Sequence, residues 1–257
     1  MLLAIDIGNT DVVLGVYHQN NWSHLWRFPT RADESMYYYE TRLKNLFLEA
    51  GLRQEYFQQV VLSSVVPAVN PAMTQLLQQF FDSPPLVLGP DIYLQMPIHV
   101  PKPYEIGSDL VANAYAAHVK YKQNAVIVDF GTALTFTVIK ESGDIMGVSI
   151  APGLKTAIHS LASNTAQLPE VPLRMPASAI GRDTTTAIQS GILVGYTGLV
   201  GHMIQSIRQE LGGHCLALAT GGLSSVLEPL QTEFTEINKL LTLEGIRAIG
   251  ELGLRNQ

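Results

Sequence analysis

Short apolar runs of strand length alternate along the chain with stretches in which apolar residues recur at helical spacing. Residues 2–7 and 12–17 are apolar runs on either side of the turn Gly8-Asn9-Thr10, a pattern that predicts a β-hairpin. The same criteria predict further strands at 22–28, 60–66, 86–88, 125–129, 134–139, 145–150 and 216–219, and helices at 36–50, 73–81, 109–119, 153–162, 184–211 and 243–254. This alternation indicates a protein of the α/β class.

Two segments of the chain share one plan. LLAIDIGNTDVVLGVY, at 2–17, and AVIVDFGTALTFTVIK, at 125–140, each consist of an apolar strand, an aspartate, a glycine turn and a second apolar strand. Asp6 matches Asp129, and Gly8 matches Gly131. An internal repeat of this kind predicts two related α/β halves, which we expect to join near the helix at 109–121.

The residues of both turns suit a phosphate group. Glycine lets the backbone turn tightly and approach a ligand, and the exposed N–H groups of such a turn form a concave donor site for phosphate oxygens. The hydroxyls of Thr10 and Thr132 add donors, and the Asp6 carboxylate can hold Mg²⁺ through water. In a single hairpin these are ordinary turn residues, but two matched hairpins favour a nucleotide site. The sequence has neither a P-loop nor a Rossmann fingerprint.

EIGSDLVANAYAAH, at 105–118, places Asp109 at the start of a predicted helix. One interpretation is a helix cap, for which Ser108 or Asp109 would serve. The other is a general base that takes a proton from a substrate hydroxyl during phosphoryl transfer. The two interpretations are compatible, and this segment alone does not choose between them.

Composition narrows the class of protein. With 257 residues, 47% of them hydrophobic and 15% charged, the chain can build a substantial core. A net charge of −6 disfavours binding to nucleic acids. Cys215 is the single cysteine, which excludes an internal disulfide and a multi-cysteine metal site. No leader precedes Asp6 and no uninterrupted apolar stretch suits a bilayer, so we expect a cytoplasmic protein without a membrane partner.

The motifs together resemble those of type III pantothenate kinases, in the actin-like, ribonuclease-H-like ATPase superfamily. The resemblance covers nearly the whole chain, in the family's order. It rests on DIGNT at 6–10, SSVVP at 63–67, GSDLVANA at 107–114, DFGTALTF at 129–136, PGLKTAIHSLASNTAQLP at 152–169, IGRDTTTAIQSG at 180–191 and TGG at 220–222.

The resemblance implies a fold and an activity. The expected fold has two related ribonuclease-H-like domains, at 1–115 and 116–257, with mixed sheets flanked by helices and a nucleotide cleft between them. The second domain would carry the interface of a homodimer. The expected reaction is phosphorylation of pantothenate by ATP to 4'-phosphopantothenate, the first step of coenzyme A biosynthesis, with Mg²⁺ and a monovalent cation, K⁺ or NH₄⁺.

The resemblance also assigns site residues. Asp109 would be the general base, Asp129 would bind the monovalent cation, and Asp6 would bind Mg²⁺ through water. The residues expected to hold ATP are Asp6, Ile7, Gly8, Asn9, Thr10, Asp11, Val12, Val13 and Thr132. Those expected to hold pantothenate are Val100, Gly107, Ser108, Asp109 and Leu110, with Thr184 entering from the second subunit.

Three positions depart from the family's usual pattern. Leu110 stands where the family usually has an arginine that helps hold the substrate. Val100 stands where a tyrosine is common, with Tyr104 as a candidate substitute, and Asp11 replaces an asparagine. These differences bear on pantothenate affinity more than on phosphate chemistry.

Two other functions remain open from the sequence. One is a nucleotide-binding regulatory protein, similar to an accessory factor, which Leu110 favours and the retained Asp109 disfavours. The other is an actin-like kinase for a different small alcohol.

Overall fold

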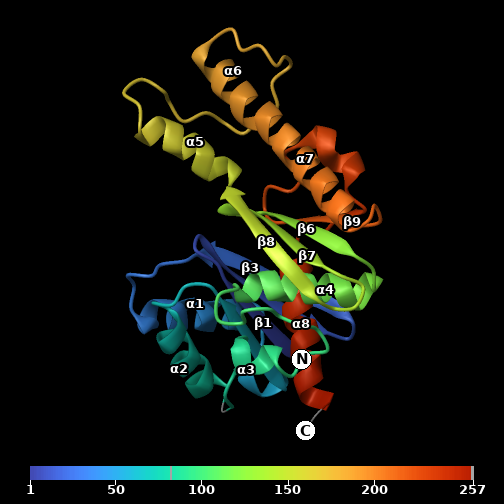
Figure 1. The fold of residues 1–257 in the computed structure, drawn as a ribbon. Coiled ribbons are helices and arrows are strands. Elements are labelled where there is room, and N and C mark those ends of the chain that lie inside the picture. Colours follow the sequence, from blue (N-terminus) through green and yellow to red (C-terminus); the bar gives the residue numbers. More distant parts are fainter. Residues whose placement is uncertain (82, 256–257) are drawn as a thin grey trace. The chain divides into compact units, whose positions relative to one another are not determined.

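The computed structural model describes residues 1–81 and 83–255, which form two compact units (Figure 1). The first comprises Met1–Ala116 and the C-terminal segment from Thr242, and the second comprises Ala117–Leu241. Each unit contains a five-stranded sheet that mixes parallel and antiparallel pairs.

The sheet of the first unit has the strand order β3-β2-β1-β4-β5. Its strands are β1 (Leu2–Ile7), β2 (Asp11–His18), β3 (Asn21–Pro29), β4 (Gln59–Ser64) and β5 (Leu86–Val87). The helices are α1 (Met36–Glu49), the 3₁₀ helix η1 (Gln54–Tyr56), α2 (Asn70–Phe80), α3 (Pro90–Tyr93), α4 (Ser108–Tyr121) and α8 (Leu241–Arg255). The chain leaves this unit within α4 and returns to it at the start of α8.

The two faces of this sheet bury different residues. Ile5 and Leu62 belong to a core that also contains Phe47 of α1 and Leu77 of α2. Because neighbouring residues of a strand point to opposite faces, Asp6 and Ser63 lie on the other face. That face also carries Val61, against which α8 packs so closely that a Cβ at Gly250 would lie 2.6 Å from Val61 Cγ2.

The sheet of the second unit has the order β10-β9-β6-β7-β8. Its strands are β6 (Ala125–Phe130), β7 (Ala133–Ile139), β8 (Ile145–Pro152), β9 (Leu216–Thr220) and β10 (Glu236–Ile237). The helices are α5 (Leu154–Ser163), α6 (Thr184–Gln189), the π-helix η2 (Ser190–Val194), α7 (Gly195–Glu210) and the 3₁₀ helix η3 (Glu228–Glu233). Val128, Phe136 and Ala219 of the sheet share a core with Leu193 and Ile204 of the long helical run.

The two sheets have the same topology. β1, β2, β3, β4 and β5 of the first unit correspond in position to β6, β7, β8, β9 and β10 of the second. In both, the hairpin strands are antiparallel and the remaining pairs are parallel. The predicted α/β fold with two related halves is confirmed, and the repeat seen in the sequence corresponds to β1–β2 and β6–β7.

The observed elements differ from the predicted ones in a few places. Helix α2 begins at Asn70, before the predicted start at residue 73, because Pro71 fits the first turn of a helix. Strand β4 ends at Ser64, before the predicted end at residue 66. The short elements α3 and β10 were not predicted, because so few residues give no periodicity. The predicted helix at 184–211 is interrupted by η2, whose wider turn accommodates an extra residue. Asp183 caps the start of α6, since its carboxylate accepts a hydrogen bond from Thr186 N at 2.8 Å.

The helical run Thr184–Glu210 is long and apolar enough to cross a membrane by length and composition, with a mean hydropathy of 1.2. We expected no such segment from the sequence. Of the 18-residue stretch of this run that is apolar enough, 33% is buried within the structure, and Leu193, Val200 and Ile204 pack in the core of the second unit. These are the contacts of a helix that packs against a sheet.

The packing of α8 on α4 gives a prediction about stability. A Cβ at Gly245 would lie 1.9 Å from Ala112 O, and the backbone of one helix cannot yield without moving the other. We therefore expect Gly245→Ala to lower the free energy of unfolding by about 1–3 kcal/mol, the usual cost of overpacking.

The matched control is Gly201→Ala in α7, where the nearest atom to the added Cβ is Leu230 Cδ2 at 3.8 Å. It should leave the free energy unchanged or raise it by up to about 1 kcal/mol, because alanine is the better helix former. Urea titration of both variants checks this; equal midpoints would show that α8 does not approach α4 so closely.

Candidate active site

The turn between β1 and β2 is held by the end of β3. Gly8 N donates to Asp11 O at 2.9 Å, and Thr30 Oγ1 donates to Gly8 O at 2.7 Å. Thr30 N also donates to Thr10 O at 2.9 Å. Asn9 and Thr10 are exposed, and Asp6 is half-buried just before the turn. The turn is therefore fixed in shape and accessible to a ligand.

The other residues expected to hold ATP contribute in different ways. Ile7 and Val12 are buried in the core, so only their backbones can reach a ligand. Asp11 Oδ2 accepts a hydrogen bond from Arg27 Nη1 at 3.1 Å, which makes it part of a surface ion pair. Val13 is half-buried on β2, opposite Asp6.

Asp109 lies in the first turn of α4. Its Oδ1 accepts a hydrogen bond from Leu110 N at 2.8 Å. A Cβ at Gly107 would lie 2.5 Å from the same oxygen, so a side chain at this position would collide with the Asp109 carboxyl group. Ser108 does not use its hydroxyl as the predicted cap; the group bonds to Ser63 and Ser64 of β4.

The surroundings change the acidity of this carboxyl group. Burial raises the pKa of Asp109, and the hydrogen bonds from Leu110 N and its own backbone N–H oppose part of that shift. Burial also raises the pKa of Tyr93, and the charge of Asp109 raises it further. Tyr93 was missed in the sequence because it lies on the short helix α3 among prolines.

Two of the three positions that depart from the family's pattern are buried and apolar. Leu110 is 9% exposed and Val100 is 8% exposed. Tyr104, the candidate substitute for the missing tyrosine, is 84% exposed, whereas Tyr93 is 3% exposed and near enough to feel the charge of Asp109.

The turn between β6 and β7 is held by the start of α5. Thr132 O accepts hydrogen bonds from Gly153 N at 3.0 Å and from Thr156 Oγ1 at 2.7 Å. A Cβ at Gly153 would lie 2.3 Å from Gly131 O, so only glycine permits this contact. The side chain of Thr132 remains exposed to solvent.

Asp129 is surrounded by oxygen atoms. The register places Thr135 of β7 on one side of it and Thr220 of β9 on the other, with all three side chains on the same face of the sheet. Both threonines are buried, and neither hydroxyl has a hydrogen-bond partner among residues 1–81 and 83–255. Gly221, at φ +90°, passes so close that a Cβ would lie 2.5 Å from Asp129 Oδ1. Oxygen donors of this kind suit a hard cation. The sequence did not indicate the two threonines, because strand register brings them together.

Within the described part of the chain, no three His, Cys, Asp or Glu side chains cluster as they would around a tightly ligated metal ion. Mg²⁺ does not require such a cage, since it keeps several waters and is usually held by one or two carboxylates and the phosphates of a nucleotide. Asp6, at the phosphate turn, is suited to that role.

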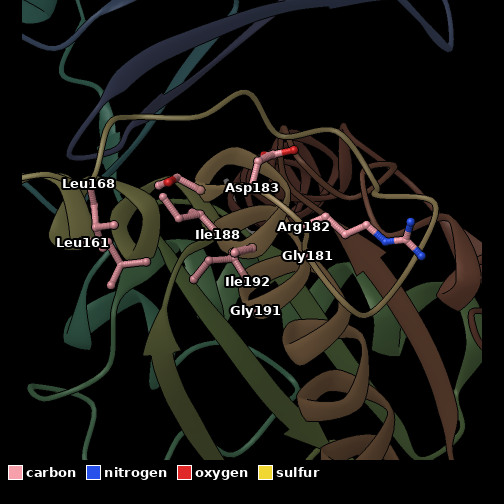
Figure 2. A pocket seen from close by; sticks show the side chains of 10 residues that line it. Leu161, Leu168, Gly181, Arg182, Asp183, Ile188, Gly191 and Ile192 are labelled. Atoms are coloured by element: carbon pink, nitrogen blue, oxygen red, sulfur yellow. The ribbon is translucent and has the colours of Figure 1, made fainter.

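Thr184 lies at a groove on the second unit (Figure 2). The groove has a volume of about 550 Å³. Leu161 and Leu168 form one wall, and Ile188 and Ile192 face them; Arg182 extends to the other side. The groove is therefore apolar, with polar groups at the start of α6.

Comparison with known proteins agrees with these features. The family model described as type III pantothenate kinase matches residues 2–206. The type III pantothenate kinase of Treponema pallidum (strain Nichols) is 40% identical over 257 residues, covering 98% of this chain and 94% of that protein. That of Syntrophus aciditrophicus (strain SB) is 37% identical over 249 residues, covering 97% and 98%.

Solved structures share the fold at low sequence identity. A Baf family transcriptional activator from Campylobacter jejuni has a TM-score of 0.63 at 17% identity, covering 98% of this chain and 99% of that one. MreB 5 of Spiroplasma citri, bound to AMPPNP, has a TM-score of 0.55 at 12% identity, with coverage of 99% and 97%. These likenesses show an actin-like ATPase fold.

The full-length relatives show more than the fold, because their identity extends over both units. The chain therefore belongs to the type III pantothenate kinase family, whose members use ATP to phosphorylate pantothenate in the biosynthesis of coenzyme A.

Proposed function

We propose that Asp109 is the general base of this kinase. The observation that carries the proposal is a carboxyl group fixed at the start of α4, beside Gly107, in surroundings that raise its pKa. A carboxylate with a raised pKa is a better proton acceptor. As the pantothenate hydroxyl oxygen bonds to the γ-phosphorus, its proton passes to Asp109. The bond from phosphorus to the β,γ-bridging oxygen breaks, and ADP leaves with the electron pair.

The remaining substrate contacts follow from the exposed groups. The N–H groups of Asn9 and Thr10, at the exposed part of the turn, are suited to phosphate oxygens, and Asp6 would hold Mg²⁺ through water. Thr132 is proposed to contact ATP with its exposed hydroxyl. Pantothenate would lie against Gly107, Ser108, Leu110 and Val100, where the buried leucine and valine leave the backbone as the source of polar contacts.

Replacement of the proposed base tests the assignment. Asp109→Asn keeps the shape of the side chain but cannot accept the proton, so we expect kcat to fall roughly 10²-fold to 10⁴-fold. Binding of ATP should be unchanged. The matched control is Asp144→Asn, an exposed aspartate bonded to Ser142, which should keep the wild-type kcat. The rate of ADP release in the presence of pantothenate, Mg²⁺ and K⁺ gives kcat for the wild type and for both variants.

The pH dependence of kcat supplies a second readout. The base works as a carboxylate, so kcat should rise with pH through the pKa of Asp109, at a midpoint above the ordinary aspartate value of 3.8. This acid limb should be absent from the residual activity of Asp109→Asn. Pantothenate-dependent turnover that survives the substitution would refute the assignment. Nucleotide binding by the wild type without turnover would favour a regulatory role, and turnover only with other alcohols would favour a different kinase.

We also propose a monovalent cation, K⁺ or NH₄⁺, at Asp129. Its carboxylate lies between two buried hydroxyls that lack partners in the described structure, and a cation would satisfy both oxygens. Bound there, the ion would supply positive charge near the turn between β6 and β7, which carries Thr132. The chain's own contribution is to hold these oxygens in place.

Removal of one hydroxyl tests the cation site. Thr220→Val should raise the KCl concentration for half-maximal activity roughly tenfold, at constant ionic strength. The melting temperature should stay the same or rise, because a buried hydroxyl without a partner costs free energy. The control is Thr137→Val, also buried but opposite Ile127 rather than Asp129. An equal KCl requirement in both variants would show that Thr220 does not face the cation.

A homodimer through the second unit accounts for the exposed apolar surface of its helices. Val194 of the helical run is 38% exposed, and Ile180, which precedes Gly181 of the groove, is 78% exposed. Side chains added at Gly191, Gly195 or Gly198 would meet no atom within 4 Å, so this surface is open to a second copy. In such a dimer Thr184 would contact the pantothenate of the second subunit.

We propose that this enzyme acts in the cytoplasm, consistent with its single, buried cysteine.

A charge on this surface should separate the subunits. Gly195→Glu fits the isolated chain, because no atom lies near the added Cβ, but it buries a charge in the proposed interface. We expect the mass of two chains for the wild type and of one chain for the variant, by light scattering. Leu48→Glu, at an 81% exposed position of the first unit, is the control and should remain dimeric. A dimeric Gly195→Glu would place the interface elsewhere.

A further inference from the structure

The loop before α4 and the end of β4 are joined by a buried pair of hydroxyl groups. Ser63 is 0% exposed and Ser108 is 5% exposed, and their Oγ atoms lie 2.9 Å apart. Buried polar groups are costly unless they are hydrogen-bonded. Ser63 follows the apolar run Val60, Val61 and Leu62 of β4 and is fully buried, so its hydroxyl requires a specific partner.

The hydroxyl of Ser108 connects to the backbone of β4 as well. It accepts a hydrogen bond from Ser64 N at 3.1 Å and donates to Ser64 O at 3.3 Å. Since Ser108 Oγ carries one proton, Ser63 is the donor in the arrangement that satisfies all these groups. The first residue of α4 is thus fixed to β4 by three contacts.

These contacts connect the strand position opposite Asp6 with the residue that precedes Asp109. Ser63 is directly opposite Asp6 in the parallel pair of β1 and β4, at a strand spacing of about 4.8 Å. Ser108 directly precedes Asp109, whose carboxyl group is held by the backbone N–H of Leu110. The carboxyl group of Asp109 therefore moves with the first turn of α4. Ser63, through its hydrogen bond to Ser108, determines where that turn lies relative to Asp6.

We propose that Ser63 is a positioning residue for phosphoryl transfer: through Ser108 it fixes the distance between the Asp109 carboxyl group and the phosphate-binding turn after β1. The proposal rests on the proposed function, in which Asp109 is the base. Ser63 itself touches neither substrate. Its hydroxyl is required because an apolar residue in its place would leave the start of α4 with only the backbone contacts of Ser64.

Kinetics of Ser63→Ala test the proposal. We expect kcat to fall roughly 10-fold to 100-fold, since a displacement of about 1 Å of a reacting group costs that much. The KM for ATP should stay within about twofold, because the turn after β1 is untouched. Ser63→Cys keeps a side chain of similar shape with a weak donor, so its kcat should lie between those of Ser63→Ala and the wild type. If the alanine variant does not fold, the kcat of Ser63→Cys tests the proposal in its place.

The matched control is Thr242→Ala. Thr242 Oγ1 donates to Asn113 Oδ1 at 2.9 Å, so the variant loses a hydroxyl contact to the same helix, one turn further along. Both variants should lose some thermal stability, but Thr242→Ala should keep kcat within about twofold of the wild type. An equal loss of kcat in the two variants would overturn the proposal, because it would indicate general loosening of α4.

Combination with Asp109→Asn separates this inference from the proposed function. If Ser63 acts through Asp109, Ser63→Ala should cause no further loss of kcat in the Asp109→Asn background. An additive loss would overturn the positioning role. Wild-type kcat in Ser63→Ala beside an impaired Asp109→Asn would overturn the positioning role alone. Wild-type kcat in Asp109→Asn would refute the base assignment, and the positioning role with it.

Discussion

The register of two parallel strand pairs determines the chemistry of both units. In the first, β1 and β4 pair so that Asp6 lies opposite Ser63. In the second, β6 and β9 pair so that Asp129 lies opposite Thr220. A slip of one residue would turn either aspartate towards the apolar core, because side chains alternate between faces. The buried residues Ile5, Ile7, Val128 and Phe130 make that slip costly, so the core that stabilises each sheet also orients its carboxylate.

The same plan serves different purposes in the two units. In the first, the group beside the aspartate is a serine whose hydroxyl is bonded to α4, and this links the strand to a second carboxyl group. In the second, the threonine at the equivalent position, Thr220, has a buried hydroxyl without a partner among the described residues, as does Thr135 on the other side of Asp129, and these two hydroxyls support the proposed cation site. A difference at equivalent positions thus gives one unit a link to the proposed base and the other the oxygen atoms of the proposed cation site.

Most of the fold could be predicted from the sequence, but only part of the site. The hairpins were evident because two long segments share apolar runs, an aspartate and a glycine turn, and their repetition indicated related halves. The link between Ser63 and Ser108 could not be predicted, since 45 residues separate the two in sequence. Thr135 and Thr220 became visible only through the register of three strands. Tyr93 was hidden in a helix too short to show periodicity.

The central claim is that Asp109 is held where it can take a proton from pantothenate while the turn after β1 binds the phosphates of ATP. A crystal structure with pantothenate, Mg²⁺ and a non-hydrolysable ATP analogue tests it most directly. We expect a carboxyl oxygen of Asp109 at about 2.6–3.2 Å from the primary hydroxyl of pantothenate, with the phosphates on the N–H groups of Asn9 and Thr10. A pantothenate hydroxyl bound away from Asp109, or phosphates bound away from that turn, would contradict the account.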